Sequence, residues 1–319
     1  MGKVRTVRKA VGLAIAASLA SLQPAKAAYP ERPVTMVVPF PAGGGADILA
    51  RGIQYAFQQS IGGQIVIKNV PGAGGSLGAA EAARSAPDGH TILLSPLGPI
   101  VIQPHRQKLT YTPDDFAPVC KLTDSPVVLM AASDAKYKKV SDVVDAAKAS
   151  PGKITYGSAG PGSIPHMAPF AFGRAAGIDI KHIPYKGAAD AIQGLLTKTI
   201  ELFTDVPNLI APYSLTPIAV FDSKRLPAYP NVPTMKEAGF DLQFSIWMAI
   251  YAPKGTPEAI LAKLESGCQA TLEDGKVKEI LEKQAQPVDF RDRKALGSFV
   301  ASEFTKAGDL IDAAGMRSK

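Results

Sequence analysis

The chain has few of the residues on which metal and nucleophile chemistry depends. It contains only four histidines and two cysteines among 319 residues. The histidines show no i, i+4 spacing and no H-E-x-x-H motif, which argues against a metal site. No G-x-x-x-x-G-K-[ST] segment is present to hold a nucleotide. The sequence therefore predicts neither a bound metal nor a cofactor.

Long hydrophobic runs are also missing beyond the N-terminal segment. A basic start at 3–9 precedes an apolar stretch at 10–22, and 25–27 reads A-K-A. The apolar stretch is shorter than the roughly 20 residues that span a bilayer. This order is typical of a secretory signal peptide. We expect a signal peptide at 1–27, cleaved near Ala27, and a periplasmic product; a retained anchor is the alternative.

The excess of positive charge belongs mostly to that segment. The chain has 35 Lys and Arg against 28 Asp and Glu, a formal net charge of +7. Residues 1–27 hold five of the basic residues and no acidic one, which leaves 30 against 28, a net charge of +2. A nucleic-acid partner is therefore not expected, because binding to phosphates needs a basic surface.

The two cysteines, Cys120 and Cys268, lie far apart in the sequence. In an oxidising compartment they could form a disulfide bond. Their spacing alone does not show that they meet in the fold. Both a disulfide and two buried thiols therefore stay open.

Apolar segments alternate with amphipathic ones, which predicts an α/β fold. The chain is long enough for two domains, each with its own core. Pro126 interrupts the long apolar segment, which therefore predicts two strands that meet at a crossing. We expect strands at 34–40, 64–69, 91–95, 116–132, 153–157, 181–185, 200–205, 215–221 and 244–253. We expect helices at 46–60, within 71–89, at 140–149, from about 164 to 177, and at 188–199, 257–273, 275–284 and 293–314.

A strand, a glycine-rich loop and a helix follow one another twice, at 37–51 and at 154–174. Ligands of open α/β sheets bind beyond the carboxyl ends of the strands. Glycines at a helix N-terminus leave backbone N–H groups free, which makes an anion site. A tight turn without a ligand is the alternative for either loop. Two matching loops favour an anionic ligand held between two domains.

Polar side chains near these loops have ordinary structural explanations as well. His166 follows the second loop and could cap or pack. Asp47 falls in a first helical turn, where it complements the helix dipole. Asp205 ends a strand, either as a carboxylate of the cleft or as a cap of the next turn. Ser158 and Ser163 lie outside a G-x-S-x-G segment, but a hydrolase that uses one of them with His166 remains a second interpretation.

The motifs together resemble the Bug family, the periplasmic substrate-binding proteins of tripartite tricarboxylate transporters. The similarity includes "YPERPVTMVVPFPAGGGADILAR" and "PGKITYGSAGPGSIPHMA" and covers nearly all of 29–319. The segments that carry it are 29–51, 66–94, 111–122, 151–168, 183–192 and 226–240.

This resemblance implies a type II periplasmic-binding-protein-like Venus flytrap of two α/β domains that close on a small organic acid. Domain I would comprise 28–125 and 248–319, and domain II 126–247. The protein would be a monomer without catalytic residues that delivers its ligand to membrane permease subunits; a sensor role is an alternative. The ligand-binding residues expected are Pro41, Ala42, Gly43, Gly44, Gly45, Ala46, Asp47, Ser95, Leu97, Ser158, Ala159, Gly160, Gly162, Ser163, His166, Thr204 and Asp205.

The sequence departs from the family pattern at the ligand site. Pro96 and Leu97 stand where small or hydroxyl residues are common, and Thr204 stands where an aromatic residue is common. The segment 205–221 is slightly shorter than usual. Pro96 and Leu97 predict an apolar wall, which favours a dicarboxylate, aromatic such as terephthalate or aliphatic such as adipate, over citrate. An amino acid whose ammonium pairs with Asp205 is the alternative.

Overall fold

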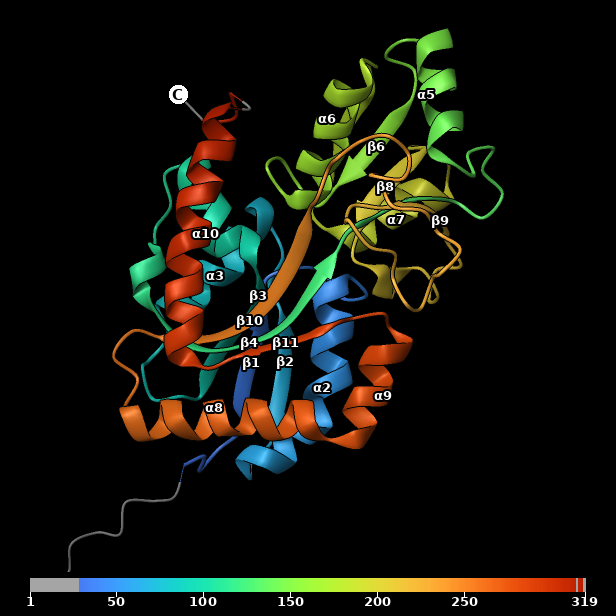
Figure 1. The fold of residues 1–319 in the computed structure, drawn as a ribbon. Coiled ribbons are helices and arrows are strands. Elements are labelled where there is room, and N and C mark those ends of the chain that lie inside the picture. The colour runs from blue at the N-terminus through green and yellow to red at the C-terminus, as the bar shows by residue number, and fades with distance from the viewer. Residues whose placement is uncertain (1–28, 314, 318–319) are drawn as a thin grey trace, which may run out of the picture.

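The structure, a computed structural model, describes residues 29–313 and 315–317. The predicted signal peptide at 1–27 lies outside these residues. In the described part of the chain, no helix combines the length and the apolar character that a membrane span requires. Figure 1 shows two lobes, with one sheet in each, and helices packed on the sheets.

The larger sheet has six strands in the order β11-β4-β10-β3-β1-β2. Strands β1, β2 and β3 are parallel, and β10 runs antiparallel between β3 and β4. The strands are β1 (Val34–Val38), β2 (Ile65–Asn69), β3 (Thr91–Pro96), β4 (Phe116–Pro126), β10 (Ser245–Pro253) and β11 (Val288–Arg291). The helices of this lobe are α2 (Gly45–Ile61), α3 (Ser76–Ala83), α4 (Gln103–Arg106), α8 (Glu258–Glu273), α9 (Gly275–Lys283) and α10 (Arg293–Ala313), with a π-helix η2 (Gly98–Ile102) and short 3₁₀ turns η1 (Ala73–Gly75) and η3 (Pro113–Asp115).

The smaller sheet has five strands in the order β7-β6-β8-β5-β9. Strand β6 is parallel to β7 and β8, whereas β5 is antiparallel to β8 and β9. The strands are β5 (Val128–Ala131), β6 (Thr155–Ser158), β7 (Lys181–Pro184), β8 (Leu202–Asp205) and β9 (Thr216–Val220). The helices are α5 (Val140–Ala149), α6 (Ile164–Ala176), α7 (Ala188–Leu196) and the 3₁₀ turn η4 (Pro207–Leu209).

Helix α2, which begins at the first glycine loop, illustrates how the apolar spacing determines packing. Leu49, Ile53 and Phe57 recur every four residues, so they share one face of the helix, and all three are fully buried. Gly62 ends the helix in the left-handed conformation, with φ of +70°. Helix α8 packs closely on this helix, because a Cβ at Gly267 would lie 2.6 Å from a side-chain carbon of α2.

Two segments connect the lobes side by side. Strand β4 ends at Pro126 and β5 begins after Val127, so the expected crossing of two strands is confirmed. The Phe221 N–H donates to the Val127 carbonyl at 2.8 Å, and the Val127 N–H donates to the Phe244 carbonyl at 3.0 Å. The chain therefore passes from one sheet to the other twice, near Val127 and near Phe244, and these two crossings lie side by side. Strands β4 and β10 extend from the larger sheet toward them (Figure 1). We propose the predicted bounds, near 126 and 247, as those of the two domains, although β10 already begins at Ser245.

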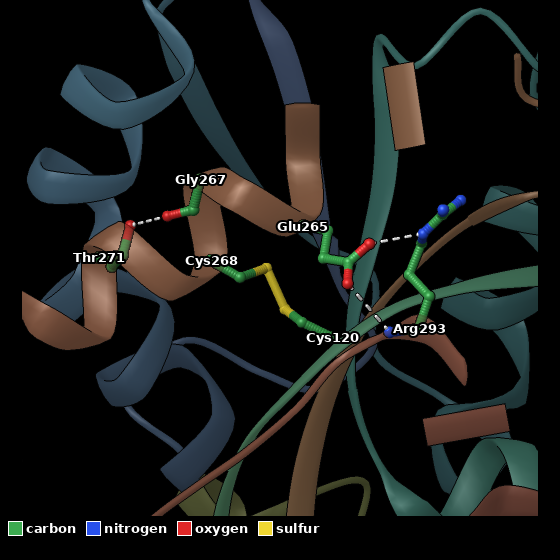
Figure 2. The surroundings of a disulfide bond; sticks show 6 residues. All are labelled: Cys120, Glu265, Gly267, Cys268, Thr271 and Arg293. Carbon is green, nitrogen blue, oxygen red and sulfur yellow. Dashed lines mark hydrogen bonds and ion pairs between the residues drawn. A yellow bond between two sulfur atoms is a disulfide. The ribbon is translucent and has the colours of Figure 1, made fainter. Parts of the chain in front are cut away.

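Cys120 of β4 and Cys268 of α8 form a disulfide, with sulfur atoms 2.06 Å apart (Figure 2). This settles the alternative that the sequence left open. Both cysteines are fully buried. An ion pair between Glu265 and Arg293, with Oε2 and Nε 2.6 Å apart, lies beside the disulfide. The disulfide therefore joins β4, after which the chain enters the smaller-sheet lobe, to α8, which follows the return of the chain to the larger sheet at β10.

Candidate functional site

A cavity lies between the lobes, where both predicted glycine loops meet. The larger-sheet lobe lines it with Phe40, Gly44, Gly45, Ala46, Gly74, Pro96, Leu97, Gly98, Gln103, Ile246 and Met248. The smaller-sheet lobe lines it with Ala159, Ser163, Ile164, Pro165, Ala188 and Asp205. The space open to the centres of water molecules is about 50 Å³. One water needs about 10–15 Å³ by this measure, so the cavity accepts several waters or one small molecule.

The first loop brings the N-terminus of α2 to the cavity. Gly44 is the N-cap residue of this helix, and no side chain among the described residues caps it. The first backbone N–H groups of α2 therefore lie at the cavity wall without a side-chain acceptor. A Cβ at Gly45 would lie 2.6 Å from a Val206 side-chain carbon of the other lobe. The glycines let the two lobes approach here.

Asp47 holds the first loop in shape and does not line the cavity. Its Oδ2 accepts from the Gly43 N–H and from Arg51 Nε, both at 2.9 Å, and its Oδ1 accepts from Asn69 at 3.0 Å. Burial alone would raise the pKa of Asp47, but the hydrogen bonds from Arg51, Gly43 and Asn69 outweigh it and hold the pKa below its usual value. Its role is structural, so the prediction that Asp47 contacts the ligand gains no geometric support.

The second loop brings the N-terminus of α6 to the opposite wall. Ser163 is the N-cap residue, and its hydroxyl donates to the Gly160 carbonyl at 2.7 Å instead of capping the helix. The Gly162 N–H donates to His166 Nδ1 at 2.9 Å. The His166 ring stacks on that of His182, with ring centroids 3.8 Å apart. His166 therefore packs and stabilises the loop, which agrees with the packing alternative from the sequence, but it does not cap α6.

Both histidines of this stack are neutral at ordinary pH. Burial, together with the charges of His182 and Arg106, lowers the pKa of His166 to about 3. Burial lowers the pKa of His182 to about 4. A neutral His166 can accept the Gly162 N–H at Nδ1, so the pair keeps the loop in place over the physiological pH range.

The geometry offers no support for a hydrolase. Ser158 is fully buried, and its hydroxyl lies 2.7 Å from Nε2 of His182, not from His166. Among the described residues, no carboxylate forms a hydrogen bond with either histidine to orient it as a base. Residues 74–78 do read G-x-S-x-G, but Ser76 is buried and has ordinary helical angles (φ −65°, ψ −27°). The described residues also contain no group of three or more His, Cys, Asp or Glu placed to bind a metal.

Asp205 is the ionisable side chain in the cavity lining. It ends β8, is 6% exposed, and its Oδ1 accepts from the Val206 N–H at 2.8 Å. Burial raises its pKa to about 7, because that single backbone hydrogen bond only partly offsets the loss of water. A carboxyl of this kind donates a hydrogen bond to a ligand carboxylate when protonated, and pairs with an ammonium when ionised.

The predicted site residues thus fall into two groups. The cavity lining includes Gly44, Gly45, Ala46, Leu97, Ala159, Ser163 and Asp205. The others do not line it in this structure: Pro41, Ala42, Gly43, Asp47, Ser95, Ser158, Gly160, Gly162, His166 and Thr204. Gly162 and His166 stabilise the second loop through their hydrogen bond. Ser95 is a fully buried residue of β3 and donates to the Pro96 carbonyl at 2.8 Å.

Sequence reasoning missed part of the cavity. The lining residues without a sequence prediction are Phe40, Gly74, Gly98, Gln103, Ile164, Pro165, Ala188, Ile246 and Met248. The i, i+2 spacing of Ile246 and Met248 places them on one face of β10, which was a usable signal. Together with Pro96 and Leu97, at the end of β3, they form an apolar wall, as the sequence predicted for these two residues.

Comparison with known proteins identifies the family. The family model described as "Tripartite tricarboxylate transporter family receptor" matches residues 49–316. A UPF0065 protein from the tcbD-tcbE intergenic region of Pseudomonas sp. (strain P51) is 33% identical over 268 residues, which is 81% of this chain and 80% of that protein. The protein BugT of Bordetella pertussis is 33% identical over 304 residues, 91% of this chain and 92% of BugT.

Solved structures agree in fold. The periplasmic binding protein BugD superposes with a TM-score of 0.86 at 33% identity, over 91% of this chain and 100% of that chain. MatC of Rhodopseudomonas palustris, solved with bound malate, has a TM-score of 0.82 at 32% identity and covers 89% of this chain and 100% of its own. R. palustris Rpa4515, solved with adipate, has a TM-score of 0.84 at 28% identity over 90% and 98%.

Proposed function

The chain belongs to the tripartite tricarboxylate transporter receptor family of periplasmic solute-binding proteins, and from this premise we propose that it captures a dicarboxylate between its lobes. The lobes close on the ligand, and the closed protein delivers it to the membrane permease subunits of the transporter. The protein acts as a monomer, and its bound ligand leaves chemically unchanged.

One observation carries this proposal: the uncapped N-termini of α2 and α6 meet in a single cavity from opposite lobes. A helix N-terminus attracts an anion through its free N–H groups and its dipole. Each hydrogen bond to a charged group contributes about 1.5–3 kcal/mol. Several such contacts supply the roughly 8 kcal/mol of a micromolar ligand. Two opposed anion sites suit a molecule with a carboxylate at each end.

The apolar wall favours a dicarboxylate with a hydrocarbon centre. Pro96, Leu97, Ile246 and Met248 offer no side-chain partner for a hydroxyl or a third carboxylate, and an unpaired buried polar group is costly. Malate in MatC and adipate in Rpa4515 are dicarboxylates, and adipate has a purely apolar centre. We propose adipate-like aliphatic or terephthalate-like aromatic diacids as the ligand class.

A thermal-shift screen of carboxylic acids, followed by calorimetry, tests the function. A ligand at about 100 times its Kd adds roughly 2.7 kcal/mol to stability, which is readily detected. Adipate, terephthalate, malate, citrate and glutamate form the series. Tightest binding of citrate or glutamate would contradict the ligand class, and no binding of any acid would contradict the function. Recovery of each ligand unchanged distinguishes a receptor from the rival hydrolase.

Transport and sensing use the same fold, so a separate experiment distinguishes them. Deleting the gene should abolish uptake of the radiolabelled ligand if the protein serves a permease. Normal uptake with lost transcriptional induction would instead favour a sensor.

A further inference from the structure

Arg106 reaches from the larger-sheet lobe to the second glycine loop. It is the last residue of α4, and its Nη1 donates to the Pro161 carbonyl at 2.6 Å. The same nitrogen donates to Gln103 Oε1 at 3.3 Å. Its side chain lies against Gly162, where a Cβ would come within 2.1 Å of Arg106 Cδ. The absence of a side chain at Gly162 therefore makes room for the guanidinium at the junction of the lobes.

No carboxylate in the part of the chain that the structure describes neutralises the charge of Arg106. Its Nε is buried, and among the described residues it has no hydrogen-bond partner. Burial accordingly lowers the pKa of this guanidinium, although it stays charged. Six other arginines do have carboxylate partners: Arg32, Arg51, Arg225, Arg291, Arg293 and Arg317. A partly buried charge without a partner is costly unless an anion arrives.

Gln103 connects this charge with the cavity. It is 1% exposed and lines the cavity. Its Oε1 accepts from Arg106 and, at 3.3 Å, from Gln107. With its oxygen held in this way, the Gln103 amide nitrogen donates to the Pro161 carbonyl at 3.3 Å. The same nitrogen lies against Gly74, another lining residue, where a Cβ would come within 2.4 Å of it. This amide, polarised by the guanidinium, therefore donates to the opposite lobe at the cavity wall.

We propose that Arg106 is a positioning residue that makes the closed cavity selective for anions. Together with Gln103 it holds the Pro161 carbonyl from the opposite lobe, which fixes the loop that leads into α6. Its positive charge favours a carboxylate at that helix N-terminus over a neutral group. This inference rests on the proposed function, since it assumes that an acid occupies the cavity.

Paired ligands separate a charge effect from a merely structural contact. Adipate and monomethyl adipate differ by one carboxylate, and malate with its monomethyl esters provides a second set. Kd values are measured by calorimetry for the wild type, Arg106→Met, Arg106→Lys and the control Arg174→Met. Arg174 is an exposed residue of α6 and has no part in the cavity lining. Thermal unfolding of each variant checks that it is folded.

We expect Arg106→Met to weaken diacid binding by roughly 10- to 100-fold, the loss of a charged interaction. The monoester should lose much less, so the preference for the diacid should fall. Arg106→Lys should restore most of this preference, and Arg174→Met should behave as wild type. Equal losses of affinity for the diacid and the monoester would show that Arg106 has only a structural role, and would overturn the proposal. Unchanged affinities for both ligands would overturn it as well. Failure of the wild type to bind any acid would instead overturn the proposed function and this inference with it. If Arg106→Met does not fold, the same comparison with Arg106→Gln decides.

Discussion

The disulfide between Cys120 and Cys268 should provide a large share of the stability, without any part in ligand recognition. The chain leaves the larger sheet after β4, builds the smaller-sheet lobe and returns at β10. The two cysteines are 148 residues apart in the sequence, so the loop that the disulfide closes contains the whole smaller-sheet lobe. In the unfolded chain it therefore restricts the entire inserted lobe. Neither cysteine lines the cavity.

The expected size follows from the length of the closed loop. The chain-entropy relation gives about 5 kcal/mol for a loop of this length, and typical disulfides give about 2–4 kcal/mol. We expect C120A/C268A to lower the free energy of unfolding by about 2–5 kcal/mol. Alanine is the better replacement, because a serine hydroxyl at either fully buried position would need a new partner.

Equilibrium unfolding in urea, followed by circular dichroism, measures this loss as a lower midpoint. Calorimetry of the folded double variant should give the wild-type Kd. Thr271→Ala is the matched control, since it removes a buried hydrogen bond on the same helix, from Thr271 to the Gly267 carbonyl at 2.6 Å, and leaves the cross-link (Figure 2). It should cost only about 1 kcal/mol. An unchanged midpoint in C120A/C268A, or a loss no larger than that of Thr271→Ala, would refute the loop argument.

Other substitutions test the cavity itself. Gly44→Val should abolish ligand binding in calorimetry with little change in melting temperature, because Gly44 lines the cavity and the new side chain would occupy space at its wall. A Cβ there would lie 3.3 Å from the Pro41 carbonyl oxygen and 3.7 Å from Ala188 of the opposite lobe. Gly275→Val, where a Cβ meets nothing within 4 Å, should bind normally. Ser163→Ala should weaken binding by about 0.5–1.5 kcal/mol, because the Gly160 carbonyl loses the hydrogen bond from the Ser163 hydroxyl. Covalent labelling of Ser163 by a serine-hydrolase probe would contradict a purely hydrogen-bonding role for this hydroxyl. Dicarboxylate affinity should fall as the pH rises through about 7, the pKa of Asp205, and Asp205→Asn should remove this dependence.

The alternation of apolar segments was sufficient to predict the α/β fold and most strands, because buried parallel strands are short apolar runs between turn residues. Strand β11 (Val288–Arg291) was missed for a physical reason. It lies at the sheet edge, pairs irregularly with β4, and has no fully buried residue. The π-helix η2 was missed because its first residues, Gly98 and Pro99, are typical of a turn.

Motif position located the two glycine loops that line the cavity, but it did not indicate the direction of each residue in them. Successive residues of a turn face different ways, so Ser163 reaches the cavity while Gly162 turns its N–H toward His166. The sequence did not indicate a role for Arg106, because no binding motif lies between β3 and this residue. Its role depends on the closeness of α4 to the opposite lobe, which no local pattern encodes.

We predict that the protonation of Asp205 decides which class of ligand the cavity prefers at a given pH. Its pKa of about 7 means that the carboxyl is protonated below that pH and donates to a ligand carboxylate. Above it the ionised group should repel the dianion, so we expect dicarboxylate affinity to be full at low pH and to be lost as the pH rises through about 7. An amino acid would behave oppositely, because its ammonium needs the ionised form. His166 and His182, with pKa values of about 3 and 4, do not titrate between pH 5.5 and 8.5.

The stability of the ligand-free protein should depend on pH in the same direction as dicarboxylate affinity, and decrease as the pH rises. The folded-state pKa of Asp205 lies above the ordinary value of 3.8, so its proton stabilises the folded state, and stability should decrease from about pH 4 to pH 7 and then level off. Asp205→Asn should flatten this part of the urea-unfolding profile. Affinity for adipate that increases with pH in the wild type, together with a profile unchanged in Asp205→Asn, would show that the carboxyl is ionised throughout. The proposed hydrogen bond from Asp205 to a ligand carboxylate would then be wrong, and the ionised carboxylate would favour a ligand that carries an ammonium group.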